Sequence, residues 1–217
     1  RNLSLMKHLA KWSNLPSTIR YVVILTVTLC LAPTAVADLP ETILKIKPSI
    51  VAVGTVLDTR RPPSQFKGTG FVVGNGNLII TNAHVLPDIL ETSEKERLVV
   101  FVEGDHRKYS RSAQVIVKDE QHDLALLKVE GAPIPPMATG DLKRLKSPYN
   151  VFQIDAIAYP GNSGSPLYDP ESGEVVGVVN SVFVKETKEA VLEKPSGITY
   201  AIPAKYVDAL VDQANAQ

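Results

Sequence analysis

The octapeptide PGNSGSPL, which spans Pro160 to Leu167, places one serine between two glycines in an otherwise apolar stretch. A serine hydroxyl on a tight loop can act as a nucleophile when a base lies beside it. The same residues also fit a plain turn, because Gly, Asn, Ser and Pro each favour turns for a separate backbone reason. Ser163 is therefore a candidate nucleophile, and its interpretation depends on finding a base.

The chain has four histidines, of which one has the context of a base. His8 lies in the N-terminal segment, while His106 in EGDHRK and His122 in DEQHD are flanked by charged residues and are expected at the surface. His84 closely follows the apolar run NLIIT, so we expect it at a strand end, where Asn82 caps a short helical turn. The alternative for His84 is a histidine in the core.

Asp123 opens the apolar run DLALLKV. An acidic residue at the head of such a strand is partly buried and needs a hydrogen-bond partner, although a simple turn residue is the alternative. The three candidates follow the order His84, Asp123, Ser163, which chymotrypsin-like proteases share and subtilisins and α/β-hydrolases do not. The hydrolase motif G-x-S-x-G also fails, because Ser165 stands at its last glycine.

The elements that must position these residues are mostly strands. Six short runs rich in β-branched residues precede residue 130: SIVAVGTV, GTGFVV, NLIIT, LVVFVEG, SAQVIVKD and DLALLKV. They predict an antiparallel sheet closed into a first barrel over about 45–130. The later runs VFQIDAIA, EVVGVVNSVFV and GITYAIPA predict a second β-unit over about 150–203, with a hairpin around DPESG.

Two segments have helical character, and one segment reads as a linker. We expect one helix over Glu41 to Lys47 and another over 204–214, where Pro203 opens a run that carries Tyr206, Leu210 and Val211 on one face. Residues 132–149 contain Pro and Lys without alternation, so they are expected to connect the two β-units. The fold class predicted from these elements is all-β, with a C-terminal helix.

Residues 1–37 are typical of a secretory signal peptide. Basic residues, among them Lys7, Lys11 and Arg20, precede the apolar run of residues 21–31, and small residues follow at 35 and 37. A membrane anchor is the alternative, but a bilayer needs about 20 apolar residues. The predicted mature chain, 38–217, is of ordinary globular composition, since the whole sequence of 217 residues is 44% hydrophobic and 21% charged.

Charge and cysteine content limit the partners of the predicted mature chain. Loss of residues 1–37 removes four of 23 basic residues and none of 23 acidic ones, which leaves a net charge of −4 and argues against nucleic-acid binding. Cys30, the only cysteine, lies in the signal, so no disulfide or lipid anchor is expected. No histidines have metal-ligand spacing, so we expect no metal and no cofactor.

The sequence resembles bacterial trypsin-like serine proteases of the HtrA (Deg) type over about residues 41–207. The resemblance is carried, in order, by GTGFVV with LIITNAHV, DLALLKVE, DAIAYPGNSGSPL, GEVVGVVNS and GITYAIPA. It implies a chymotrypsin-like double β-barrel and a periplasmic or secreted serine endopeptidase that acts on polypeptides, unfolded proteins among them. It is also compatible with an oligomer, and it implies no stable membrane insertion after signal cleavage.

The resemblance also assigns roles at the site. Ser163 would attack the peptide carbonyl, with His84 as general base and Asp123 orienting the imidazole. The amides of Gly161 and Ser163 would form the oxyanion hole. The pocket for the residue before the cleaved bond would be walled by Ile157, Val179, Asn180 and Ser181. These walls carry no acidic group, so a preference for small aliphatic side chains is expected.

The sequence departs from the family in the second barrel. Only 40 residues separate Asp123 from Ser163, about half the family interval, with the break near Ser147. A barrel shortened by two strands would leave sheet edges unpaired. A catalytically inactive, protease-like binding module is therefore the alternative function.

The sequence departs from the family in two further ways. Ser165 replaces the second glycine of the family's Gly-Gly pair, and no PDZ domain is expected before Gln217. A ligand-binding β-sandwich would require the order of the triad residues to be coincidence.

Overall fold

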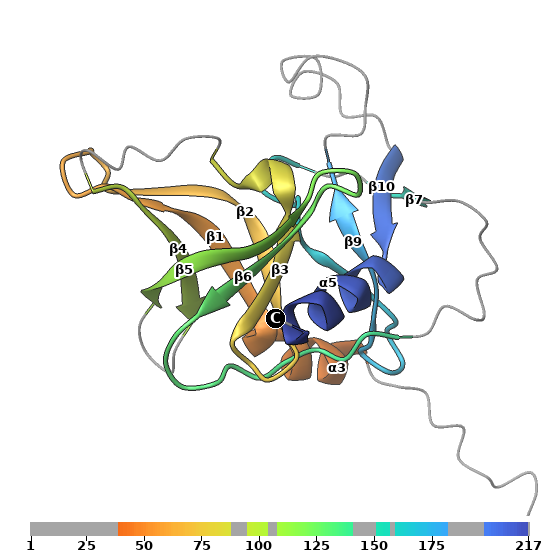
Figure 1. The fold of residues 1–217 in the computed structure, drawn as a ribbon. Coiled ribbons are helices and arrows are strands. Elements are labelled where there is room, and N and C mark those ends of the chain that lie inside the picture. Colours follow the sequence, from red (N-terminus) through yellow and green to blue (C-terminus); the bar gives the residue numbers. More distant parts are fainter. Residues whose placement is uncertain are drawn as a thin grey trace, which may run out of the picture. The chain divides into compact units, whose positions relative to one another are not determined.

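The structure is a computed structural model that describes residues 39–87, 95–103, 108–140, 151–156, 159–181 and 198–216 (Figure 1). The predicted signal peptide, His106, Ser147 and Ile157 lie outside these ranges. Within them, none of the helices has the length and apolar character that a membrane span requires. The helices and strands are, in chain order, α3 (Leu39–Ile46), η1 (Lys47–Ser49), β1 (Ile50–Val56), β2 (Ser64–Val73), β3 (Leu78–Asn82), η2 (Ala83–Val85), β4 (Arg97–Glu103), β5 (Lys108–Asp119), β6 (Leu124–Val129), β7 (Phe152–Asp155), β8 (Pro166–Tyr168), β9 (Val175–Asn180), β10 (Ile198–Pro203) and α5 (Lys205–Asn215).

Strands β1 to β6 form a closed barrel in the order β1-β2-β3-β6-β5-β4, and neighbouring strands are antiparallel. Strand β1 closes the barrel because it pairs with both β2 and β4. Its pairing with β2 shifts between Val53 and Gly54, and a Cβ on Gly54 would lie 2.1 Å from the Gln65 carbonyl oxygen. The glycine thus permits the irregularity that bends the strand. The barrel expected from the six apolar runs is confirmed.

The second β-unit is a four-stranded antiparallel sheet in the order β7-β10-β9-β8, counted over the described residues. Strands β8 and β9 form the hairpin predicted around DPESG. Among the described residues this sheet contains fewer strands than the barrel, in agreement with the short interval between Asp123 and Ser163. The all-β class with a smaller second unit and a C-terminal helix is confirmed.

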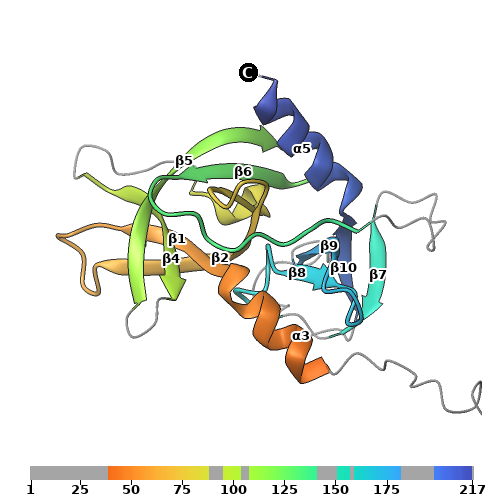
Figure 2. The same ribbon diagram turned by 90° about the horizontal axis from the view of Figure 1, so that it is seen from below.

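Alternation along the strands divides the apolar residues between two cores. In β6, Ala125, Leu127 and Val129 belong to the core inside the barrel, whereas Leu124 and Leu126 belong to a second core. The second core also contains Val175, Val178 and Ile202 of the second sheet and Val207 and Leu210 of α5. Both faces of β6 are therefore buried. The barrel, the second sheet and α5 share this second core, and Figure 2 shows α5 beside β5 and β6.

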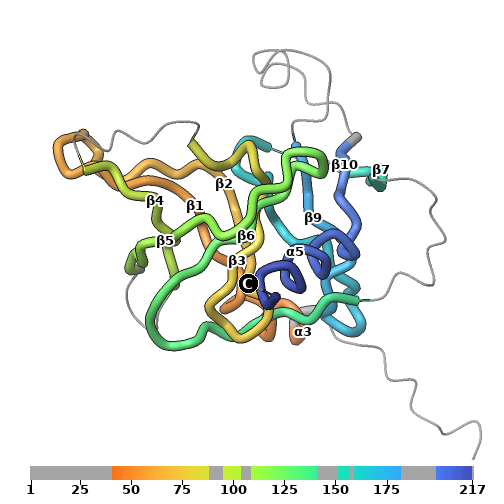
Figure 3. Tube along the Cα trace, in the orientation of Figure 1, coloured from red at the N-terminus to blue at the C-terminus, as the bar shows by residue number. Residues whose placement is uncertain are grey.

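The segment after β6 was expected to be a linker, but its described part is attached to both β-units. The backbone N–H of Ile134 donates to the Gly76 carbonyl at 2.9 Å, and Ile134 and Met137 are buried. Thr139 then forms a parallel bridge with Val175 of β9. Figure 3 shows this segment in green, running from β6 past α3 to the second sheet. Residues 130–140 thus help to hold the two β-units together.

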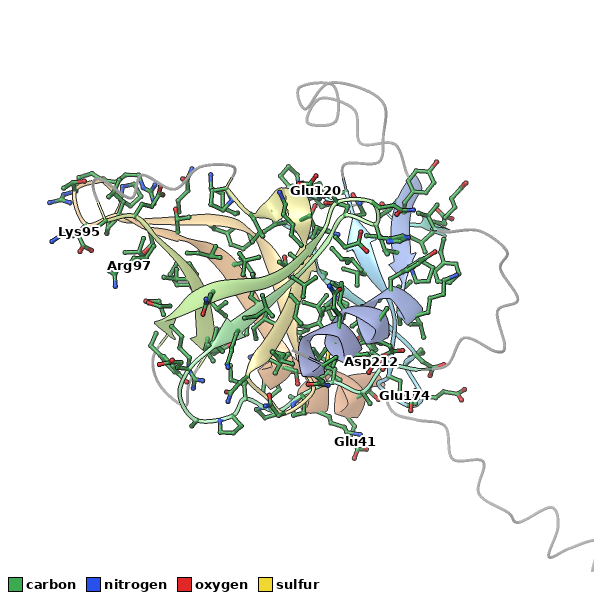
Figure 4. The ribbon with its side chains drawn as sticks, in the orientation of Figure 1. Glu41, Lys95, Arg97, Glu120, Glu174 and Asp212 are labelled. Carbon is green, nitrogen blue, oxygen red and sulfur yellow. The ribbon has the colours of Figure 1, made fainter. Side chains whose placement is uncertain are left out.

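Both predicted helices are confirmed, within one or two residues at each end. Helix α3 buries Thr42 and Ile46, and the Thr42 hydroxyl donates to the Pro170 carbonyl at 2.9 Å. Helix α5 buries Val207 and Leu210. The charged side chains labelled in Figure 4, such as Glu41 on α3 and Asp212 on α5, are exposed. The apolar face of α5 therefore points to the core, as its sequence pattern predicts, whereas α3 leaves Ile43 and Leu44 exposed.

Candidate active site

His84 and Asp123 are brought together by the pairing of β3 with β6. Asn82, the last residue of β3, pairs with Leu124, the first residue of β6, so the residues just beyond these ends are neighbours. Oδ1 of Asp123 accepts a hydrogen bond from the backbone N–H of His84 at 2.9 Å, and Oδ2 lies 2.6 Å from Nδ1 of His84. An ionised carboxylate only accepts hydrogen bonds, so a hydrogen bond between these two atoms places a proton on Nδ1 of His84.

Asp123 itself is held from several sides. Its carbonyl oxygen accepts from the backbone N–H of Ala83 at 3.1 Å and from Nδ2 of Asn82 at 2.9 Å. Its Oδ2 also accepts from Nδ2 of Asn180 at 2.7 Å. Asp123 adopts a φ of +53°, which is uncommon for a residue other than glycine. The hydrogen bonds stabilise this backbone conformation and the orientation of the carboxylate.

The prediction that Asn82 caps the helical turn η2 is wrong. No side-chain hydrogen bond caps η2: Nδ2 of Asn82 donates to the Asp123 carbonyl, and Oδ1, the atom that would accept from a helix N–H, is buried without a hydrogen-bond partner in the described part of the chain. Asn82 is fully buried at the end of β3, where the nearest acceptor is the carbonyl across the β3–β6 pair. The residue thus supports the carboxylate side of the site rather than the histidine side.

The loop around Ser163 belongs to the second β-unit but is fastened to the barrel. The Ser163 carbonyl accepts from the backbone N–H of Thr69 on β2 at 2.9 Å, and the Gly161 carbonyl accepts from Oγ1 of Thr69 at 2.7 Å. On the other side, the Gly164 N–H donates to the Val179 carbonyl of β9 at 2.9 Å. Ser163 is only 4% exposed. The loop is therefore held between β2 and β9.

Two glycines in this loop adopt conformations that favour glycine. Gly161 has a φ of +101° and Gly164 a φ of +86°. A Cβ on Gly164 would lie 2.0 Å from the Thr69 carbonyl oxygen. Within the described ranges, the backbone N–H groups of Gly161 and Ser163 donate to no acceptor. Two neighbouring N–H groups without acceptors are what an oxyanion hole requires.

The Ser163 hydroxyl is hydrogen-bonded to the hydroxyl of Ser181. No hydrogen bond joins Ser163 to His84 among the residues that the structure describes. Of the three predicted triad side chains, His84 and Asp123 are therefore in direct contact, whereas the Ser163 hydroxyl is hydrogen-bonded to Ser181. The triad assignment itself stays a prediction.

The residues predicted to wall the substrate pocket have varied surroundings. Val179 is half-buried, and its backbone pairs with Gly164 and Ser165. The side chains of Asn180 and Ser181 contact Asp123 and Ser163, respectively. Their assignment to the pocket stays a prediction.

The hydrogen bonds that Asn82 and Asn180 donate to Asp123 were not predicted from the sequence. A buried asparagine at the end of an apolar strand nevertheless indicates a nearby acceptor.

The described part of the chain contains no group of three or more His, Cys, Asp or Glu side chains arranged to hold a metal ion. The groups that the structure describes at the site are a hydroxyl, an imidazole, a carboxylate and backbone N–H groups. These groups suit nucleophilic acyl transfer.

Comparisons with known proteins agree with this architecture. Residues 68–147 match the trypsin-like peptidase domain family. A Pseudomonas putida (strain GB-1) protein named "Probable periplasmic serine endoprotease DegP-like" is 27% identical over 193 residues, which cover 72% of this chain and 36% of that protein. A Hahella chejuensis protein of the same name is 29% identical, with 72% and 37% covered. The chain thus spans little more than a third of the length of these relatives.

A solved structure titled "HtrA-type protease AlgW with decapeptide" has a similar fold. Its TM-score is 0.60 at 17% sequence identity, and the match covers 83% of this chain and 68% of that chain. The fold is therefore chymotrypsin-like, as the resemblance implied. The domain match, the relatives and the fold together confirm the resemblance to HtrA-type proteases.

Proposed function

We propose that this protein is a serine endopeptidase that cleaves polypeptides through Ser163, His84 and Asp123. The observation that carries the proposal is the 2.6 Å contact between Nδ1 of His84 and the Asp123 carboxylate, at the barrel end where the Ser163 loop is attached. A carboxylate in this position holds the imidazole in the tautomer that a general base needs. The relatives, named as periplasmic serine endoproteases, support the same activity and a periplasmic or secreted location.

The proposed reaction begins when the Ser163 hydroxyl leaves Ser181 and turns to Nε2 of His84. Oγ then forms a bond to the peptide carbonyl carbon while its proton passes to Nε2. The negative oxygen is stabilised by the N–H groups of Gly161 and Ser163, each worth about 3 kcal/mol in enzymes where such donors were removed. His84 returns the proton to the leaving amine as the C–N bond breaks. Water hydrolyses the resulting acyl-enzyme by the same steps.

A fluorophosphonate probe tests this proposal, because it reacts covalently with activated serines. The wild-type protein is expected to be labelled at Ser163, and Ser163→Ala and His84→Ala are expected to lose labelling by about 10⁴-fold or more. Ser172→Ala is the matched control, because Ser172 is an exposed serine in the β8–β9 hairpin that takes no part in the site. Labelling that survives Ser163→Ala would contradict the proposal.

The second candidate function is a catalytically inactive, protease-like binding module. The contact of Ser163 with Ser181 instead of His84, together with the four-stranded second sheet among the described residues, favours it. Well-folded wild-type protein that the probe does not label, and that binds an unfolded polypeptide without cleaving it, would establish this function.

We further propose that the enzyme prefers a small aliphatic residue before the cleaved bond. Of the four predicted wall residues, Val179, Asn180 and Ser181 are described, and none is acidic. Basic side chains would therefore find no counter-charge among them. Peptides that differ only in Val, Ala or Arg at this position test the preference, and faster cleavage after Arg would refute it.

A further inference from the structure

A second acid–histidine pair lies beside the Asp123–His84 pair. Oδ1 of Asp119 accepts from the backbone N–H of His122 at 3.0 Å, and Oδ2 lies 2.6 Å from Nδ1 of His122. Asp123 contacts His84 with the same pattern of bonds. The two pairs share the turn between β5 and β6, where Figure 4 labels Glu120.

The His122 ring lies at the surface turn that the sequence predicts, but it is partly covered. Only 20% of its side chain is exposed, because the ring stacks on Tyr206 of α5 with the centroids 3.8 Å apart and an angle of 23° between the planes. The charged neighbours in DEQHD indicated a solvated turn, whereas the covering residue comes from more than 80 residues away in the chain. Stacked aromatic pairs of this kind contribute about 0.5–1.5 kcal/mol beyond their burial.

Tyr206 is itself fixed in place by the rest of α5. The next residue, Val207, is fully buried, and Leu210 is 3% exposed, so this part of the helix is anchored in the core shared with β6. Thr139 donates to Oδ1 of Asp208 at 2.6 Å. The ring of Tyr206 therefore presents a fixed surface to His122.

His122 directly precedes Asp123, whose φ of +53° is uncommon. Such backbone conformations cost about 1–3 kcal/mol and persist only where the surroundings enforce them. On the C-terminal side, the pairing of Leu124 with Asn82 provides this restraint. On the N-terminal side, the His122 side chain is held between Asp119 and Tyr206.

We propose that Asp119, His122 and Tyr206 form a positioning cluster that fixes the backbone of Asp123 and, through it, the His84–Asp123 hydrogen bond. Helix α5 thereby takes part in setting the geometry of the site. An effect of the cluster on the catalytic rate rests on the function proposed above. An effect on the geometry of the His84–Asp123 hydrogen bond does not depend on that function.

The charges around the cluster favour an intact Asp119–His122 bond. Burial raises the pKa of Asp119, but hydrogen bonds from His122 and the charge of its imidazole outweigh this effect, so the pKa lies below its ordinary value of 3.8. Asp119 is thus ionised at neutral pH and accepts from Nδ1. The other charged groups nearby are Lys205, with Nζ 4.8 Å from the Tyr206 ring centroid, and the Lys118–Glu120 ion pair at 3.0 Å.

Proton NMR of the full chain tests the cluster without requiring activity. A proton on Nδ1 of histidine in a short bond to a carboxylate resonates far downfield, and His84→Ala and His122→Ala assign the two signals. Tyr206→Leu removes the stacking partner and is expected to weaken or broaden the His84 signal. Tyr206→Phe keeps the ring and should keep the signal. Val211→Ala is the matched control, because it changes the same helix and the same core away from His122.

An unchanged His84 signal in folded Tyr206→Leu would overturn the proposal. Should this variant fail to fold, Asp119→Asn provides the same test, because it keeps the size of the side chain and removes the charged acceptor from His122. The expected result is again a weakened His84 signal, and an unchanged signal again overturns the proposal.

Reaction with the fluorophosphonate probe adds a kinetic measurement. Because displacement of a catalytic group by about 1 Å can cost about 100-fold in rate, a partly released Asp123 in Tyr206→Leu is expected to slow the maximal labelling rate about tenfold. The probe concentration for half-maximal rate should not change, and Tyr206→Phe should restore the rate. Wild-type protein that does not react would refute the proposed function alone, and the NMR result would still decide the role of the cluster.

Discussion

Replacing Gly164 with alanine tests whether the Ser163 loop is held as closely to the barrel as the structure indicates. A Cβ at this position would lie 2.0 Å from the Thr69 carbonyl oxygen and 2.6 Å from Oγ1 of Thr81, whereas real Cβ contacts below 3.0 Å essentially never occur. The loop and β2 must therefore separate by about 1 Å. This strains the bond from the Thr69 N–H to the Ser163 carbonyl.

Two costs contribute to the expected loss of stability in Gly164→Ala. An alanine at a φ of +86° costs about 1–2 kcal/mol, and overpacking costs about 1–3 kcal/mol. Together they predict a loss of about 2–5 kcal/mol in the free energy of unfolding, which urea denaturation measures. Since each kcal/mol lowers Tm by about 2–4 °C in proteins of this size, Tm should fall by about 10 °C. A 1 Å shift of the loop should also slow fluorophosphonate labelling about 100-fold.

Gly74→Ala is the matched control for this experiment. Gly74 has a φ of +61°, but its nearest neighbour would be a flexible side-chain atom, Cδ1 of Leu78, at 3.3 Å. This variant therefore carries the backbone cost of about 1–2 kcal/mol without the steric overlap, and it should be labelled at the wild-type rate. Equal destabilisation by the two alanines would refute the close approach of the loop to β2.

Three further predictions follow from individual contacts. Asn180→Ala removes a 2.7 Å hydrogen bond to the Asp123 carboxylate, worth about 1.5–3 kcal/mol for a charged acceptor, so the rate of serine labelling should fall at least tenfold; an unchanged rate would show that the amide is not needed. The pKa of Asp119 is lowered in the folded state, so its ionised form stabilises the protein above its ordinary pKa of 3.8, and this contribution is lost as the pH falls through the lower folded value. Asp119→Asn should therefore be less stable than wild type at pH 7 in urea denaturation and should approach wild-type stability in strong acid, whereas a difference independent of pH would exclude the charge as its source. Leu126→Ala, at a fully buried position, should lose about 2–5 kcal/mol in urea denaturation, whereas Val115→Ala, at a position 41% exposed, should lose less than about 1 kcal/mol, and similar losses would contradict the assignment of Leu126 to the shared core.

The strands and helices could be predicted because their signals are local. Alternation in runs such as DLALLKV predicts a strand, independently of the strands with which it pairs in the fold. The run after Pro203 likewise predicts an amphipathic helix. The connection predicted over 132–149 is irregular in its described part, as its lack of alternation indicates, but its attachment to both β-units could not be predicted. Its attachment comes from backbone hydrogen bonds to residues more than 50 positions earlier, such as that from Ile134 to Gly76.

The all-β class, the barrel strands, the order of the three candidate catalytic residues and the glycines around Ser163 can all be read from the amino-acid sequence. The contacts of the site depend on tertiary packing: Asn180 donates to Asp123, Ser181 is hydrogen-bonded to Ser163, and Tyr206 stacks on His122, the residue before Asp123. The physical reason is that backbone conformation follows from neighbours in the chain, whereas the partners of a buried polar group follow from how separate β-units and a helix pack around a shared core.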